Sequence, residues 1–359
     1  MDMKKYLIST IACALLAGCS SNSGIYPKLA LDAKYTKSRT TKNFDNYVVF
    51  LKQKAAGEGV SGRVLNEGDI KYVARAVQLD KEQSSKRQTP NAKKVNPNGV
   101  TNYLNKVLTT SKVNTAAERW KKFQPQLAQV SQKYGVQKEY IVALWGMESS
   151  FGRSQGKFDV LSVLATLAFE GRREQLFTQE FVNAMKMIDS QSITRSEMKG
   201  SWAGAMGQTQ FMPTSYIKYA ADGNRDGRKD IWTDEHDAFA SIANYLSTVG
   251  WNDKLPWGIE VKLAQPIDMS FSGLEPNLAK SLAEWQAWGV YLAYPNALEL
   301  AKQQALQSEK LWLVRPDNGA GRAFLVSENY RTILDWNRSN HFAISIGKFA
   351  DRILEKVNR

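Results

Sequence analysis

A single acidic residue, Glu148, stands at the end of an almost wholly apolar stretch, ALWGMESSFG. If residues 140–147 form a helix, its turn of about 100° per residue places Glu148 on the same face as Trp145 and Glu139 on the opposite face. Burial beside Trp145 and the negative end of the helix dipole would raise the pKa of Glu148, whereas we expect Glu139 to be solvated. A carboxyl that keeps its proton near neutral pH suits general acid catalysis. From this stretch alone, a surface glutamate at a helix end is an equally good interpretation.

The period of residues 140–147 fits a buried helix and a strand equally well. We favour the helix, because residues 137–139 make an acceptable first turn after Gly135. Gly152 can then lie just past its C-terminus.

The stretch SWAGAMGQTQFMPTSY, residues 201–216, combines small residues with amides and aromatic rings. Gly204 and Gly207 would let a ligand approach the backbone closely. Three side chains offer hydrogen bonds to the hydroxyl and acetamido groups of a sugar: Ser201, Gln208 and Gln210. Three rings could stack on sugar faces, although each alone is more often part of a core: Trp202, Phe211 and Tyr216. The stretch is a candidate sugar-binding loop that leads, through Pro213, into a new helix.

The sequence DGNRDGRKD, residues 222–230, matches D-x-N-x-D-G, the opening of an EF-hand calcium loop. Oxygen ligands recur at alternate positions, and glycine allows the sharp turn. The twelfth position is Thr233 instead of the usual bidentate glutamate, so a standard loop is incomplete. Asx turns held by hydrogen bonds, without a metal, are the alternative.

The first residues have the pattern of a bacterial lipoprotein signal. Lys4 and Lys5 precede an apolar run, which ends in small residues before Cys19. We expect residues 1–18 to be removed, which leaves Cys19 as the only thiol and excludes an internal disulfide. By resemblance to bacterial lipoproteins, Cys19 would carry acyl chains, and Ser20 after it suggests the periplasmic face of the outer membrane.

The formal net charge is +13, and 43% of the residues are hydrophobic. This is an ordinary globular composition, and no stretch after the N-terminus is long and apolar enough to span a bilayer. A basic protein is attracted to anionic surfaces, but we expect no nucleic acid partner for an exported lipoprotein. Anionic lipid headgroups and acidic groups of the cell wall remain, as does lysine that merely keeps the protein soluble.

Helical spacing of apolar residues is present in residues 44–80, from about residue 116 to Gly135, and again in residues 341–357. Residues 81–100 contain too few apolar residues to pack and are expected to form a long loop. Alternating apolar and polar residues in 256–326 predict a small mixed region. Its expected elements are strands around Ile259, Trp312 and Phe324 and one helix near residues 278–288.

In their order along the chain, ALWGMESSFG and KGSWAGAMGQTQFMPTSY resemble the membrane-bound lytic murein transglycosylase B family, which cleaves the glycan of peptidoglycan. The stretches GKFDVLSVLATLAFEGRREQLF and DAFASIANYLSTVGW are similar to it as well. The resemblance covers most of residues 44–255 and part of the C-terminal region, whereas residues 256–325 match only weakly.

The resemblance implies a mainly α (α+β) fold with a lysozyme-like catalytic core, a flanking helical domain and a small mixed domain. The boundaries expected are residues 1–18 for the signal peptide, 19–43 for a flexible tether, 44–120 for the helical domain, 121–255 for the core with its EF-hand-like loop, 256–325 for the mixed α/β domain, and 326–359 for a segment that returns to the core.

By the same resemblance, Glu148 is the catalytic acid. Substrate-binding residues are expected at Ser201, Gln210, Tyr245, Arg172, Arg173, Trp336 and Asn337. The family has a Tyr-Asn pair where this chain has Trp336 and Asn337, so this chain lacks the hydroxyl of that tyrosine. Calcium, in a structural role, is expected at Asp222, Asn224, Asp226, Arg228 and Asp237, where Asp237 closes a loop with one extra residue and Arg228 offers only its carbonyl.

The implied reaction cleaves the bond between N-acetylmuramic acid and N-acetylglucosamine without water and forms a 1,6-anhydro sugar. One acid suffices, whereas an ordinary glycosidase needs a second carboxylate. Glu170 and Asp159 are the nearest in sequence, and Asp159 has the pattern of a helix cap. No catalytic cofactor is expected, and we expect a monomer.

Three other functions are weighed. A hydrolytic muramidase and a non-catalytic, peptidoglycan-binding lipoprotein would use the same cleft. An esterase is suggested by G-x-S-x-G at residues 152–156 with His341 downstream, but that motif needs a strand before it and a helix after it. With only His236 and His341 in the chain, a zinc site has little support.

Overall fold

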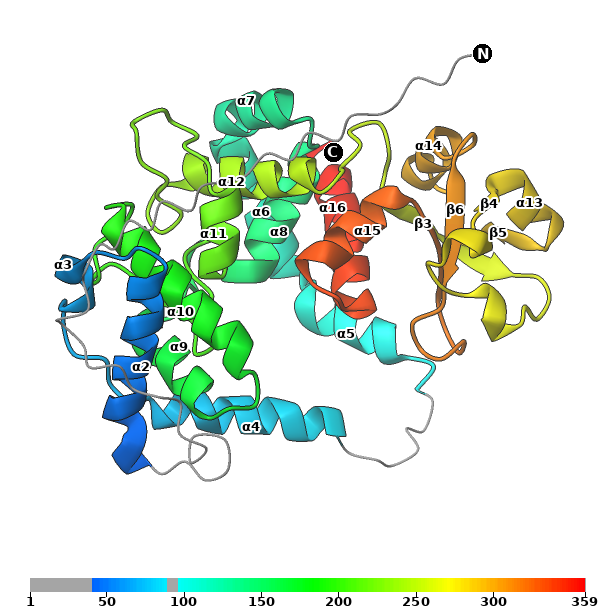
Figure 1. Cartoon of the computed structure of the whole chain (residues 1–359). Coiled ribbons are helices and arrows are strands. Elements are labelled where there is room, and N and C mark those ends of the chain that lie inside the picture. Colours follow the sequence, from blue (N-terminus) through cyan, green and yellow to red (C-terminus); the bar gives the residue numbers. More distant parts are fainter. Residues whose placement is uncertain (1–40, 89–95, 359) are drawn as a thin grey trace, which may run out of the picture.

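The computed structural model describes residues 41–88 and 96–358. The expected signal peptide, Cys19 and nearly all of the expected tether lie outside the described residues. Within them the chain is mainly helical, with one two-stranded and one five-stranded antiparallel sheet. The larger sheet lies at one end of the helical body, beside α14 (Figure 1). Of the helices in the described ranges, none combines the length and apolar character of a bilayer-spanning segment.

The N-terminal helices pack around α9 (Val160–Phe169), whose residues are all buried. α2 (Phe44–Gly57), which follows the short turn η1 (Thr41–Asn43), contacts α9 and α10 (Glu174–Asp189), while α3 (Gly62–Leu65) contacts α10. α4 (Ala74–Gln88) contacts α9 and runs below it in Figure 1. This layer forms one side of the helical body.

The prediction of a loop over residues 81–100 is wrong at both ends, because α4 continues to Gln88 and α5 (Gly99–Val107) begins before residue 100. Residues 81–83 are exposed on the helix. Unbranched polar side chains favour a helix without burial, and Gln78 donates a 2.9 Å hydrogen bond to Glu82 one turn later. The low apolar content of this segment therefore indicated that the segment is not packed in a core. It did not indicate that the segment lacks a helix.

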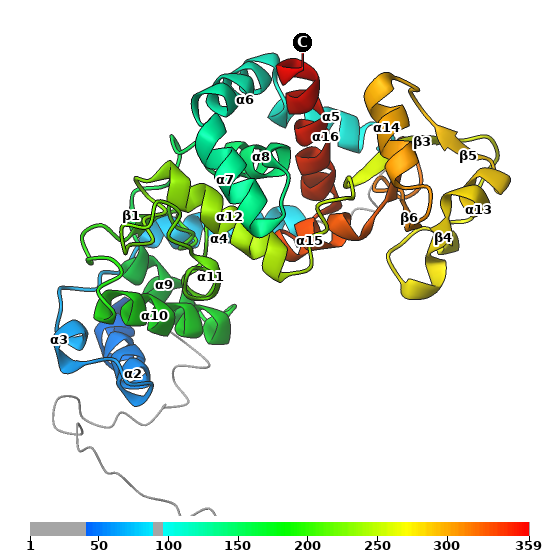
Figure 2. The same ribbon diagram turned by 90° about the horizontal axis from the view of Figure 1, so that it is seen from above.

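α8 (Lys138–Ser149) crosses the middle of the molecule, which confirms the helix expected over residues 140–147. It is surrounded by α6 (Thr110–Lys122), α7 (Gln124–Tyr134), α12 (Glu235–Thr248) and α16 (Asn340–Val357). α16 confirms the helix expected at residues 341–357 and lies beside α8 (Figure 2). A Cβ added at Gly146 would meet the Phe349 ring at 2.9 Å. Burial on all sides explains why the α8 sequence has no amphipathic period.

A short ribbon connects α9 to the loop that follows α10. β1 (Phe158–Asp159) pairs antiparallel with β2 (Lys199–Gly200). Asp159 caps α9, as expected, by accepting the Leu161 N–H at 3.1 Å. After the ribbon, α11 (Pro213–Tyr219) begins at Pro213, as predicted.

The five-stranded sheet has the order β4-β6-β7-β3-β5 and contains the three expected strand regions. Its strands are β3 (Gly258–Leu263), β4 (Lys280–Ser281), β5 (Val290–Leu292), β6 (Lys310–Val314) and β7 (Ala323–Val326). The expectation of one helix is incomplete: besides α13 (Leu282–Ala287) there are α14 (Ala297–Ala305) and the turns η2 (Met269–Phe271) and η3 (Pro276–Leu278). The sheet has its own apolar core around the fully buried Trp285.

β3 does not alternate in burial, because Glu260 is buried together with its neighbours. The Glu260 carboxylate pairs with Arg322 at 2.5 Å and with Lys348 of α16 at 3.1 Å. Lys302 of α14 pairs with Asp351 of α16 at 2.8 Å. These buried ion pairs join the sheet region to α16.

α15 (Glu328–Trp336) follows β7 and leads into α16. The sequence pattern did not identify this helix. It carries Trp336 to the C-terminal end of α8, where the predicted acid lies.

Candidate active site

The end of α8 is shaped by three successive residues in the left-handed region: Ser150, Phe151 and Gly152, with φ of 51°, 62° and 81°. Gly152 therefore lies just past the helix, as predicted. Its N–H donates a 2.9 Å hydrogen bond to Ser149 Oγ, which holds the turn. The turn leaves Glu148 in the last turn of the helix, partly buried.

The Glu148 carboxyl is desolvated, and burial raises its pKa to about 7. The indole N–H of Trp336 donates a 2.8 Å hydrogen bond to Glu148 Oε1 and acts in the opposite direction, because it favours the charged form. No carboxylate of the described residues contributes to the rise. The predicted direction of the shift is confirmed, and its main cause is burial.

The prediction that Glu139 is solvated is wrong. Glu139 is partly buried in the first turn of α8, and burial raises its pKa to about 7 as well. Nearby Asp351 of α16 adds to the rise. An angular position on an isolated helix could not reveal this, because α8 is covered on nearly all sides.

Aromatic rings from three helices and from Phe211 form a wall, and Trp336 connects this wall to Glu148. The Trp336 ring lies 4.7 Å from the Tyr245 ring of α12 and 5.3 Å from the Phe211 ring. Tyr245 also contacts Tyr219 of α11, with ring centroids 4.5 Å apart. The fold thus brings together Glu148, Trp336 and Tyr245 from α8, α15 and α12. Asn337, the residue after α15, is exposed.

Ser201 and Gln210 lie on the same irregular ribbon as β2. Gly200 bridges to Met206, and Met206 bridges to Phe211. Ser201 Oγ accepts the N–H groups of Ala203 at 3.3 Å and Ala205 at 3.1 Å, so its own O–H can donate to a ligand. Gln210 has a φ of 51°. Its amide nitrogen donates to the carbonyls of Gln155 and Gly207 at 3.2 and 2.9 Å.

Several expectations for this loop are wrong because its residues pack internally. Gln208 is 3% exposed and accepts the indole N–H of Trp145 at 2.7 Å, so it does not face a ligand. A Cβ at Gly204 would meet Leu164 at 2.5 Å, and one at Gly207 would meet Ile231 at 2.7 Å. Both glycines therefore serve packing and left-handed turns, not the approach of a ligand.

Two of the three rings proposed to stack on sugars belong to the core. Phe211 and Tyr216 are each 3% exposed, and the Tyr216 hydroxyl donates to the Lys229 carbonyl at 2.8 Å. Trp202 is only partly buried. Of the three, Trp202 alone retains an accessible face.

Arg172 and Arg173 meet at a buried carboxylate of α4. Arg172 Nε donates to Asp80 Oδ2 at 2.9 Å, and Arg173 donates to Asp80 Oδ1 at 3.0 Å. Asp80 is 6% exposed, whereas the two arginine side chains are 46% and 38% exposed. Two positive charges on one carboxylate leave a net positive cluster, partly open to solvent.

Tyr103 of α5 was not identified from the sequence. Burial raises the pKa of its phenol, a hydrogen bond with Ser345 lowers it, and the charge of Glu148 raises it. Nothing in the local sequence signals the influence of Glu148 on Tyr103, because it depends on how α5 packs.

The acids considered as second carboxylates have other partners. Asp159 caps α9 and pairs with Arg195 at 2.7 Å. Glu170 accepts the Tyr72 hydroxyl at 2.6 Å. The G-x-S-x-G segment, residues 152–156, lies in the turn after α8 with no strand before it and no helix starting at its serine, so the esterase motif is contradicted.

The predicted calcium loop gathers oxygen atoms. Carboxylate oxygens of Asp222, Asp226 and Asp237 lie within 4.8 Å of one another. Asp237 is fully buried in the first turn of α12, and burial raises its pKa to about 6. Three oxygens from carboxylates suit a hard cation, so these residues fit calcium. Asn224 instead directs its amide nitrogen at Asp226, at 3.2 Å, and Arg228 is exposed.

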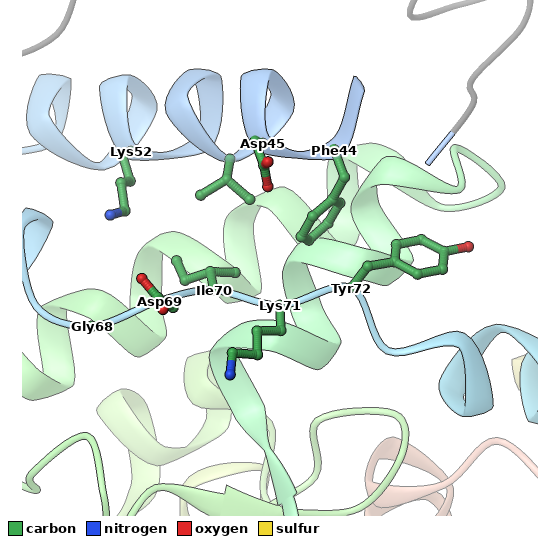
Figure 3. A pocket seen from close by; sticks show the side chains of 9 residues that line it. Phe44, Asp45, Lys52, Gly68, Asp69, Ile70, Lys71 and Tyr72 are labelled. Carbon is green, nitrogen blue, oxygen red and sulfur yellow. The ribbon is translucent and has the colours of Figure 1, made fainter. Parts of the chain in front are cut away.

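A separate pocket of about 560 Å³ opens between α2 and residues 68–72 (Figure 3). Its lining has two lysines and two aspartates, Lys52, Lys71, Asp45 and Asp69, together with the rings of Phe44 and Tyr72. None of the residues expected to bind or cleave a glycan lines it, so it is not part of the site around Glu148.

Comparison with known proteins places the chain among peptidoglycan enzymes. Residues 43–351 match the family described as Transglycosylase SLT domain. The chain is 33% identical over 261 residues to membrane-bound lytic murein transglycosylase B of Escherichia coli, covering 72% of this chain and 68% of that protein.

Solved structures agree. SltB3 of Pseudomonas aeruginosa, in complex with NAG-anhNAM-pentapeptide, matches with a TM-score of 0.75 and 34% identity over 87% of this chain and 79% of that one. Lytic transglycosylase Slt35 of Escherichia coli, in complex with calcium, matches with a TM-score of 0.68 and 26% identity over 87% and 94%. The mainly α (α+β), lysozyme-like fold is confirmed. This chain therefore belongs to the transglycosylase SLT domain family and is a lytic transglycosylase, a lyase that cleaves peptidoglycan.

Proposed function

We propose that Glu148 is the single catalytic acid with which this chain cleaves the β-1,4 bond between N-acetylmuramic acid and N-acetylglucosamine. The observation that carries the proposal is a desolvated carboxyl that receives the Trp336 N–H and has a pKa raised to about 7, a rise to which no carboxylate of the described residues contributes. A carboxyl whose pKa is raised toward neutral pH can act as a general acid while it is protonated and as a base once it has given up its proton. Binding of NAG-anhNAM-pentapeptide by SltB3 supports an anhydro product.

The reaction needs two proton transfers at one group. Protonated Glu148 donates its proton to the glycosidic oxygen as the bond from that oxygen to the muramoyl C1 breaks. The carboxylate so formed accepts the proton of the muramoyl C6 hydroxyl while that oxygen bonds to C1. The products are a free 4-hydroxyl on N-acetylglucosamine and 1,6-anhydro-N-acetylmuramic acid, and Glu148 is again protonated.

The glycan would lie along the ribbon and the aromatic wall. Ser201 would donate its hydroxyl hydrogen, and Gln210 would accept with its amide oxygen, because their other polar atoms bond to backbone groups. Tyr245 belongs to this aromatic wall, and the exposed Asn337 follows Trp336 in the chain. Arg172 and Arg173 would contact carboxylates of the peptides of peptidoglycan through the guanidinium N–H groups that do not bond to Asp80.

We infer that the loop after α11 holds a structural calcium ion. Asp222, Asp226 and Asp237 supply carboxylate oxygens, and the calcium complex of Slt35 supports the assignment. Asn224 would supply its amide oxygen to the ion after a flip of the side-chain amide, and Arg228 would supply its backbone carbonyl oxygen. The ion would fix the start of α12, the helix that carries Tyr245.

We propose the domain limits given above, with residues 326–359 belonging to the core, because α16 packs on α8. Acyl chains on Cys19 would anchor the protein at the periplasmic face of the outer membrane, in line with its membrane-bound relative. We also propose that the protein acts as a monomer.

Digestion of purified peptidoglycan, followed by mass spectrometry, tests the assignment of the acid. We expect anhydro-muropeptides from the unchanged chain, a loss of at least about a thousandfold in Glu148→Gln, and near-normal release from Glu139→Gln. Glu139 is the matched control, because it lies on the same helix with a similarly raised pKa. Reducing ends would support hydrolysis instead, and binding without release would support a non-catalytic protein.

A further inference from the structure

Among the described residues, Trp336 makes the only hydrogen bond to the Glu148 carboxyl, from Nε1 to Oε1 at 2.8 Å. The indole is held in place by the rings of Tyr245 and Phe211, 4.7 and 5.3 Å away. The chain around it is fixed as well, because the next residue, Asn337, donates its N–H to the Ile333 carbonyl at 3.1 Å. Trp336 therefore presents its N–H in one direction.

An indole N–H can only donate a hydrogen bond. In a protonated carboxyl the carbonyl oxygen accepts a hydrogen bond more strongly than the hydroxyl oxygen, so the indole donor favours Glu148 Oε1 as the carbonyl oxygen. We propose that Trp336 is a positioning residue that keeps the proton of Glu148 on Oε2, the oxygen that then faces the glycosidic bond. This inference rests on the proposed function of Glu148.

Both proton transfers of the reaction then take place at Oε2. The O–H bond at Oε2 breaks as the glycosidic oxygen takes the proton, and the C6 hydroxyl later returns a proton to the same Oε2. Throughout, Oε1 keeps its hydrogen bond to Trp336, which stabilises the carboxylate formed between the two transfers. A tyrosine hydroxyl at residue 336 could donate or accept and would not make this distinction.

Other charged or titratable groups around the α8 end come from several elements. They are Tyr103 of α5, Lys112 of α6, Arg153 of the following turn, Tyr245 of α12 and Asp335 of α15. Apart from burial, Trp336 is the group that shifts the pKa of Glu148, and it lowers it. Loss of the indole N–H should thus raise that pKa.

The test uses Trp336→Phe in the full chain, which keeps an aromatic ring and removes the N–H. In the plot of activity against pH, the alkaline limb, where activity is lost, should move upward by about one pH unit. The reason is that the acid stays protonated to a higher pH. The plateau value of kcat should fall about tenfold, because the proton is no longer confined to one oxygen. Phe211→Leu loosens the ring packing but keeps the N–H, so it should lower the plateau without moving the limb.

An unmoved limb in Trp336→Phe, or an equal movement in Phe211→Leu, would overturn the inference. Should Trp336→Phe not fold, nitrogen-15 NMR of the unchanged protein decides: the Trp336 indole resonance should titrate with the Glu148 pKa of about 7 and lose that step in Glu148→Gln. An indole that does not respond to pH contradicts the proposal. Failure of the proposed function is distinguishable, because it would show as an unchanged chain that releases no anhydro product.

Discussion

Glu148 and Glu139 lie on the same helix, and burial raises the pKa of both to about 7. Their surroundings differ in what else they contact. Glu148 receives the Trp336 N–H at the end of α8, whereas Glu139 has no such bond within the described residues and the charge of Asp351 adds to the rise of its pKa. A raised pKa alone therefore does not identify a catalytic acid, and the neighbours decide.

Glu139→Gln should stabilise the protein above neutral pH. A carboxyl whose pKa is raised on folding binds more protons in the folded state, so the free energy of unfolding falls as pH rises from about 4.5 to about 7. Removing the group removes this loss, by about 1–3 kcal/mol at about pH 8. The gain should disappear near pH 4, where both states are protonated.

Urea unfolding of both proteins at the two pH values measures this difference. An equal effect at both pH values would show that Glu139 does not titrate with a raised pKa. A variant with a lower free energy of unfolding than the unchanged protein at high pH would contradict the predicted direction.

At the scale of elements, α4 is tied to the start of α10 by Asp80 and the two arginines. Asp80→Asn leaves Arg172 and Arg173 close together without a compensating charge. We expect it to lower the free energy of unfolding by about 1–3 kcal/mol, less than for a fully buried pair because both arginines are partly exposed.

Chemical denaturation of Asp80→Asn beside Asp45→Asn, which removes an exposed aspartate of α2, measures the effect. Equal stability of the two variants would show that the Asp80 cluster does not hold α4.

Elements could be predicted from the sequence where a local pattern of residues defines them. The roles of side chains could not be predicted where they depend on contacts with residues distant in the sequence. α8, α16 and the Asp159 cap could be predicted, because an apolar run, a long amphipathic period and a cap are local signals. The roles of Gly207 and Gln208 could not, because Ile231 and Trp145 approach them only in the fold.

The residues around Glu148 show the same division. A carboxylate after an apolar run can be recognised, and the resemblance to a family supplied Trp336 as a neighbour. Its indole hydrogen bond to Glu148, and the influence of Glu148 on Tyr103, depend on how α15 and α5 pack against α16 and have no local signal.

At the scale of the molecule, calcium would join the loop after α11 to α12. Binding to the folded state alone adds about 2.7 kcal/mol when the ion is at a hundred times its Kd. Melting in calcium and in excess chelator should therefore show a Tm several degrees higher with the ion, and Asp237→Asn should abolish the difference. An identical Tm in both conditions would contradict the assignment.

The central claim is that one carboxyl exchanges bonds without water. Digestion of peptidoglycan by the unchanged chain in water enriched with oxygen-18, with the muramoyl products weighed by mass spectrometry, tests it most directly. The account predicts anhydro products that carry no oxygen-18. Muramoyl reducing ends that contain the isotope would show that water attacks C1, and would contradict it.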